Sequence, residues 1–224
     1  MDTLKEYETL VKELKSAESD LIEAGRSNKE RSAEETKRII TNAEKELQVL
    51  GINALGPIHQ NIEKTSKIFA NDGVVTYFTL DPFKSMFAER EKFEKTPYGR
   101  LHTEWYPTIT GLEDAYIRAD RKGELTVNLH NLWPLLSLVS SDTGTNNGNM
   151  QLNIYPDIEG ERGLTGKTFQ LSATGDVNGE QNVYGACVDF LGALVDYSNK
   201  ITPDMFGKIL TNAHKLWLNK YGEE

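Results

Sequence analysis

The stretch Val74-Val75-Thr76-Tyr77-Phe78-Thr79-Leu80 is the clearest strand signal in the chain, because all seven residues are β-branched, aromatic or leucine. Asp81 and Pro82 follow it and are typical of a helix start. Residues 74–80 are therefore predicted to form a strand, and the other strands and helices are assigned on either side of it.

The next strand signals, over residues 115–129, predict an antiparallel hairpin. Apolar residues alternate at Ile117 and Ala119 and again over residues 125–129. Gly123 stands in the polar turn between them, where a positive φ is needed. Because strands joined by a tight turn run antiparallel, this segment sets the predicted direction of the sheet.

Outside the hairpin, the apolar periodicity changes between strand and helix several times. Two more strands are expected over residues 150–155 and 167–173, and helices over 57–73, 82–93, 133–138, 181–199 and 203–221. The predicted fold class is α+β, with a mainly antiparallel sheet of about five strands and flanking helices.

The N-terminal quarter has a different composition from the rest of the chain. Of the twenty aromatic residues, only Tyr7 precedes Phe69, and residues 1–50 carry twenty-one charged side chains. Capping signals and narrow apolar seams predict helices over residues 3–24 and 32–50. Together they predict an N-terminal antiparallel helical hairpin over 1–51, distinct from an α+β globular domain over 52–224.

The apolar seam of this predicted hairpin is the first candidate contact surface. A helix gains most of its stability from packing, so the seam needs either the globular domain or another chain. Both interpretations stay open from the sequence. The seam residues expected to make the contact are Leu4, Val11, Leu14, Ile39, Ala43 and Leu47.

Charge and composition argue against several classes of protein. A net charge of −9 and a pI near 5.1 argue against binding nucleic acid through its phosphates. No apolar run approaches the roughly 20 residues that span a bilayer, and the first residues lack a secretory signal. The single cysteine, Cys187, fits a reducing compartment, so we expect a cytoplasmic protein.

Motifs for cofactors and metals are incomplete. Residues 160–168 resemble a phosphate loop, but Glu161 occupies the first glycine position and a strand pattern follows. Cys187 has no histidine at a characteristic spacing and is expected to be a buried structural cysteine. The histidines form no pair with metal-ligand spacing. We therefore expect no cofactor and no metal.

The stretch 95–106 is the most site-like loop, because it combines the side chains that line clefts and make strong contacts. His102 and Glu104 are the acid and base candidates, and Arg100 is a candidate anion clamp. The aromatic binding candidates are Tyr98, Trp105 and Tyr106. In the other interpretation, Trp105 and Tyr106 fill the core. A polar loop over 141–149 could face the same cleft.

Three functional hypotheses follow. The first is a non-enzymatic interaction or assembly protein, whose helical hairpin contacts a protein partner or a second copy. The second is a hydrolase or a protein that binds a small polar or anionic ligand between loops 95–106 and 141–149. The third is an acidic inhibitor of a basic partner, since residues 140–224 carry eleven acidic and six basic side chains. Without a catalytic motif, the first is preferred and enzymatic activity is left undecided.

Overall fold

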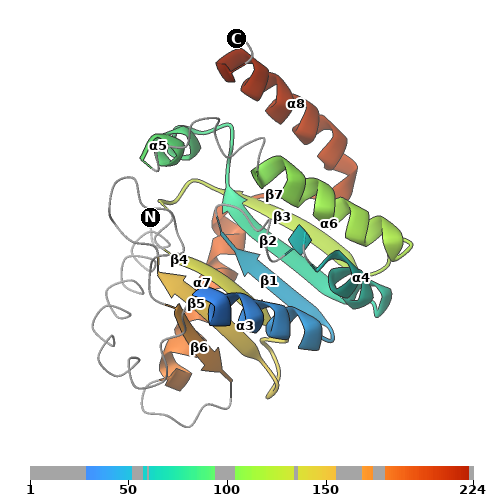
Figure 1. Ribbon diagram of the computed structural model, residues 1–224, viewed down its shortest axis with the longest axis vertical. Helices are drawn as coiled ribbons and strands as arrows, with labels where there is room; N and C mark the ends of the chain where they lie inside the picture. Colours follow the sequence, from blue (N-terminus) through green and yellow to red (C-terminus); the bar gives the residue numbers. More distant parts are fainter. Residues whose placement is uncertain are drawn as a thin grey trace.

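A computed structural model describes residues 29–51, 58–59, 61–93, 104–133, 136–154, 168–173 and 180–221 of the chain (Figure 1). Within these residues it contains six helices and seven strands. The helices are α3 (Lys29–Asn42), α4 (Ile62–Ala70), α5 (Ser85–Phe93), α6 (Tyr106–Arg118), α7 (Glu180–Tyr197) and α8 (Pro203–Tyr221). The strands are β1 (Glu46–Leu50), β2 (Val74–Leu80), β3 (Glu124–His130), β4 (Leu136–Ser141), β5 (Asn149–Ile154), β6 (Thr168–Ser172) and β7 (Asn199–Ile201).

All seven strands form one mixed sheet in the order β6-β5-β4-β1-β2-β3-β7. The central strands β1, β2 and β3 are parallel, and β4, β5, β6 and β7 join their neighbours in antiparallel pairs. Parallel neighbours need long crossovers, and here α4 connects β1 to β2, while α5 and α6 connect β2 to β3. The carboxyl ends of the three parallel strands consequently meet at one edge of the sheet.

Helices cover both faces of the sheet unequally. In Figure 1, α3, α4, α6 and α8 lie on one face and α7 crosses the other. The larger core cluster joins the first group of helices to side chains such as Leu47, Val75 and Val127. The smaller cluster joins α7 to Leu50, Phe78 and their neighbours. Because side chains alternate along a strand, each central strand supplies both layers.

The prediction of a mainly antiparallel sheet of about five strands is wrong, although the α+β class holds. Residues 115–118 are not a strand but the end of α6, with Ala119 as its C-cap, and Ile109, Leu112 and Ala115 of this helix are buried. The reversal before β3 therefore joins a helix to a strand. As a result β3 pairs in parallel with β2, with Val74 beside Glu124.

The predicted helix over residues 32–50 is also wrong in its second half. Helix α3 ends at Asn42, and residues 46–50 form β1 at the centre of the sheet, with β2 on one side and β4 on the other. Backbone pairing with two distant segments outweighed the local helical spacing. The predicted antiparallel helical hairpin over 1–51 therefore lacks its second helix as expected over 32–50, and its first helix lies outside the described residues.

Other predictions have mixed outcomes. The predicted helix over 133–138 is wrong, because Leu136 begins β4, which pairs with both β1 and β5. Strands over residues 74–80, 150–155 and 167–173 are confirmed as β2, β5 and β6. The two C-terminal helices are confirmed as α7 and α8. None of the described helices is long and apolar enough to cross a membrane.

Candidate functional site

The carboxyl ends of the parallel strands are the first place to search for a site, because ligands of open α/β sheets bind there. Strand β1 is followed by Gly51, whose N–H donates to the carbonyl of Phe78 at 3.0 Å. Asp81 follows β2, and its N–H donates to the carbonyl of His130 at 2.8 Å. The three strand ends thus form a continuous hydrogen-bonded edge that ends in His130.

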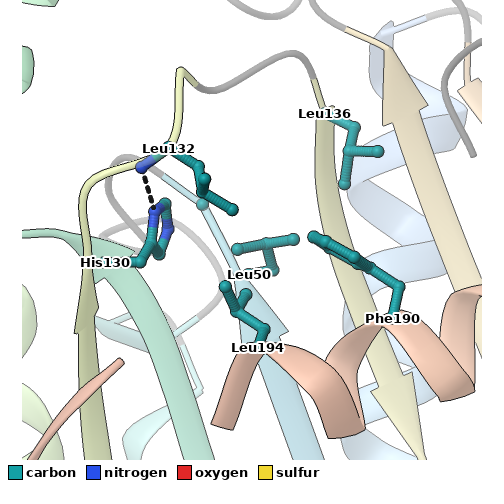
Figure 2. Close-up of a pocket in the computed structure, with 7 residues that line it drawn as sticks. Leu50, His130, Leu132, Leu136, Phe190 and Leu194 are labelled. Atoms are coloured by element: carbon teal, nitrogen blue, oxygen red, sulfur yellow. Dashed lines mark hydrogen bonds between the residues drawn. The ribbon is translucent and has the colours of Figure 1, made fainter. Parts of the chain in front are cut away.

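A small pocket lies at this edge, between the strand ends and α7 (Figure 2). Its volume is about 10 Å³, which is close to the least that a single water molecule requires. Its walls are Leu50, Gly51, His130, Leu132, Leu136, Phe190 and Leu194. The pocket is therefore apolar except for the imidazole of His130 and backbone groups.

His130 is 5% exposed and holds a defined orientation. The N–H of Leu132 donates to its Nδ1 at 3.3 Å, as the dashed line in Figure 2 shows. Burial lowers the pKa of His130 to about 4, since desolvation disfavours the imidazolium. The ring is thus neutral near pH 7, and because Nδ1 accepts a hydrogen bond, the proton lies on Nε2.

Among the described residues of β3, two buried polar side chains at this end of the sheet have atoms without a hydrogen-bond partner. They are His130, through Nε2, and Asn128, through both Nδ2 and Oδ1. Asn128 is fully buried and lies two residues before His130 on β3. Residues two apart on a strand share a face of the sheet. The pair therefore forms a polar patch on the side that α7 covers.

Two charged residues of α5 are also buried near this edge. The guanidinium of Arg90 lies 5.1 Å from the ring centre of Phe93 and 5.3 Å from that of Trp133. Both distances suit cation–π attraction. The neighbouring carboxylate of Glu91 accepts a hydrogen bond from Lys220 of α8 at 2.9 Å. These contacts tie α5 to the segment after β3 and to α8.

The amino end of β1 is organised by Asp142, the residue after β4. Its carboxylate accepts N–H hydrogen bonds from Glu44 at 3.0 Å, and from Lys45 and Glu46 at 2.9 Å each. In return Glu46 accepts the N–H of Thr143 at 2.8 Å. An anion held by three successive backbone N–H groups closes this end of the strand.

Tyr184 of α7 completes the amino-end network. Its hydroxyl donates to the carbonyl of Thr143 at 3.4 Å. Burial, and then the negative charges of Glu46 and Asp142, raise the pKa of Tyr184 to about 12. The tyrosine remains a neutral donor at ordinary pH. The 141–149 loop is thus a turn held to β1 and α7, and it borders an open polar depression of about 510 Å³.

The sequence-predicted cleft residues are not brought together in the described part of the chain. Trp105 is fully buried in the larger core cluster, and Glu104 and Tyr106 are half-buried. Helix α6 runs back from there to the amino end of β3, so its start lies at the carboxyl edge. Asp142 and the 141–149 turn lie at the opposite end. Tyr98, Arg100 and His102 lie outside the described residues.

Three of the six predicted contact residues lie in the described part of the chain, and the other three lie outside it. Ile39 is 2% exposed and Leu47 is 0% exposed, and Ala43 packs partly buried against the same core. These three side chains pack in or against the core of the globular body, and Ile39 and Leu47 offer almost no accessible surface. Leu4, Val11 and Leu14 lie outside the described residues. Cys187 is buried, as expected, and burial raises the pKa of its thiol to about 12.

Asn128 and His130 were not among the site residues predicted from the sequence. Alternation such as that of Leu125, Val127 and Leu129 is typical of a strand with one solvent-exposed face, but β3 is covered on both faces. Among the described residues, no group of three or more His, Cys, Asp or Glu could hold a metal ion. No protein-family model and no curated protein matches the chain.

Proposed function

We propose that the protein is a non-enzymatic, cytoplasmic assembly protein that binds a second copy of itself through the segment before α3. The observation that carries this proposal is the burial of Ile39 and Ile40, which places the apolar face of α3 in the core. The seam predicted over residues 3–24 therefore lacks the helical partner that the sequence suggested, and it needs another apolar surface.

Helix α8 offers a suitable surface. Met205 is 41% and Leu216 is 37% exposed, and half-buried Ile209 lies between them. Steps of four and seven residues place these three side chains along one stripe of the helix. The stripe borders the buried face of α8, and the last turns of the helix project beyond the sheet in Figure 1.

The charges of the two segments favour this docking. Residues 1–24 carry seven acidic and three basic side chains, whereas α8 carries one acidic and three basic ones. Lys208 and Lys215 flank the stripe. Opposite net charges steer association and add to the contact of the apolar seams.

The position of α3 favours exchange between copies. Helix α3 contacts β4 and β5, whereas α8 directly follows the edge strand β7. These strands lie towards opposite edges of the sheet order. A segment that continues from α3 would have to cross the body to reach its own α8, but it can reach that of a second copy.

The described polar groups give less support to a hydrolase. A general acid or base works best with a pKa near the operating pH, and that of His130 is lowered to about 4. Its Nε2 carries a proton and its Nδ1 accepts the Leu132 N–H. This arrangement suits hydrogen-bond donation within the fold rather than proton transfer.

Light scattering of the full chain tests the assembly proposal. We expect wild-type protein to have the mass of a dimer, and Leu14→Asp to have that of a monomer with an unchanged melting temperature. Ser16→Asp adds the same charge outside the seam and should remain dimeric. A monomeric wild-type protein, or a dimeric Leu14→Asp variant, would contradict the proposal.

A second pair of variants tests the receiving surface. Leu216→Asp should also give a monomer, and Thr211→Asp, which adds the same charge to another exposed side of α8, should not. If Leu14→Asp dissociates the dimer but Leu216→Asp does not, the segment is the assembly contact and α8 is not its receiver.

A further inference from the structure

The buried pair Asn128 and His130 has a hydrogen-bonding capacity that the described protein atoms do not fill. The carboxamide of Asn128 can donate two hydrogen bonds and accept at its oxygen, and neutral His130 donates from Nε2. None of these atoms has a hydrogen-bond partner in the part of the chain that the structure describes. An unfilled buried polar group destabilises the folded state, so a guest that fills several of them is strongly favoured.

The shape of the pocket limits the guest to one small molecule. His130 forms part of its wall, and in Figure 2 the ring stands among Leu50, Leu132 and Leu194. The volume of about 10 Å³ is close to the minimum for one water molecule. Larger ligands would have to displace side chains that pack between the sheet and α7.

The chemistry of the walls limits the guest to a neutral one. The five side chains other than His130 are leucine and phenylalanine, and the imidazole is uncharged at neutral pH. A bare ion in such surroundings would lose its hydration without gaining a counter-charge. The donor at Nε2 requires an acceptor atom, which a water oxygen provides.

The spacing along β3 allows a single molecule to join both residues. Residues two apart on a strand are separated by about 6.6 Å, and two hydrogen bonds through one oxygen span up to about 6 Å. Asn128 and His130 lie two residues apart on the same face of β3, and His130 lines the pocket. The two side chains therefore need to approach each other only slightly for both to form hydrogen bonds to one small molecule.

From these observations we propose that the carboxyl end of β3 contains a binding site for one buried water molecule, held by His130 Nε2–H and by the carboxamide of Asn128. The water accepts from the imidazole and donates to the amide oxygen. It satisfies polar groups that would otherwise be stranded between the sheet and α7, and it fixes the orientation of His130 from the side opposite Leu132.

Nuclear magnetic resonance of wild-type protein labelled with ¹⁵N in histidine tests the site. We expect the neutral Nε2–H form of His130 at pH 7, with a through-space cross-peak between that proton and a long-lived water. The exposed ring of His214 is the internal control and should show only fast-exchanging solvent. A His130 Nε2–H without a water cross-peak, or a ring protonated on Nδ1 instead, would overturn the proposal.

Two substitutions distinguish the roles of the two ring nitrogens of His130. Nε2–H is the donor that faces the pocket, and Nδ1 accepts the hydrogen bond from Leu132. His130→Gln keeps a donor near the position of Nε2, and His130→Asn keeps an acceptor near that of Nδ1. Among variants that remain folded, the long-lived water should persist in His130→Gln and be lost in His130→Asn. Persistence in both would show that His130 does not hold the water. If neither variant folds, the wild-type spectrum decides.

Discussion

The two ends of the central parallel strands contain buried polar groups in opposite states. At the amino end, Asp142 binds three consecutive backbone N–H groups, and Glu46 and Tyr184 complete the network. At the carboxyl end, Asn128 and His130 retain atoms without protein partners. The first arrangement stabilises the fold by itself, whereas the second is completed by a guest. A cluster of buried polar groups indicates a binding site when some of its hydrogen-bond donors and acceptors have no protein partner.

Removing the carboxylate of Asp142 should have the largest effect. Asp142→Ala leaves the N–H groups of Glu44, Lys45 and Glu46 without their acceptor, so we expect the free energy of unfolding to fall by about 3 kcal/mol. Urea denaturation measures it. Asp142→Asn keeps one acceptor oxygen and tolerates the positive φ of 49° at this position.

The asparagine variant should therefore lose less stability than the alanine variant. Equal losses would show that the charge, and not the number of hydrogen bonds, holds the amino end. A loss below about 1 kcal/mol in both would remove the distinction between the two ends.

At the carboxyl end, the burial of His130 should make the free energy of unfolding depend on pH. The pKa of His130 is lowered to about 4 in the folded protein, against 6.5 for an ordinary histidine. Between these values the unfolded chain binds the extra proton, so stability is full above pH 6.5 and declines as the pH falls to 4. His130→Phe removes this dependence.

The measurable quantity is the difference between wild-type and His130→Phe free energies of unfolding, from urea titrations at several pH values. This difference should fall by a few kcal/mol on going from pH 6.5 to pH 4. A constant difference would mean that His130 titrates as it does in the unfolded chain.

A smaller effect is expected where α7 meets the amino-end turn. A Cβ added at Gly148 would lie 2.2 Å from the hydroxyl oxygen of Tyr184. Gly148→Ala should therefore reduce stability by about 1–2 kcal/mol, as thermal or urea unfolding would show. Removing the hydroxyl with Tyr184→Phe in the same chain should restore part of the loss. No restoration in the double variant would place the clash elsewhere in the turn.

The last prediction concerns the accessibility of Cys187 and involves no change in the sequence. This residue belongs to the same layer between the sheet and α7 as the pocket. Burial raises the pKa of its thiol from 9.0 to about 12, which lowers the thiolate fraction about a thousandfold. Labelling by a thiol reagent at pH 8 should be far slower in the folded chain than in urea. Rapid labelling would show that this layer opens easily.

The parts of the fold with strong local signals were predictable from the sequence. The β-branched run over 74–80 and the apolar periodicity of the two C-terminal helices describe β2, α7 and α8 well. The segment 46–50 has helical spacing and becomes β1, because its hydrogen bonds go to β2 and β4. Pairing between segments that are distant in the sequence leaves no local sequence pattern. For the same reason the parallel pairing of the central strands was not predicted.

The candidate site was less predictable than the fold. In the sequence Leu125-Thr126-Val127-Asn128-Leu129-His130, polar residues at every second position indicate a solvent face. The structure covers that face with α7, which follows some fifty residues later. Trp105 illustrates the reverse case, because the sequence around it suggested a site, whereas its ring fills the core.

The most direct test of the contrast between the two ends is an NMR titration of the His130 ring from pH 7 to pH 4. We expect the His130 ring to stay neutral and protonated on Nε2 until the pH approaches 4. A His130 ring that becomes imidazolium near pH 6.5 would contradict it, because a charged, solvated imidazole cannot belong to a closed pocket.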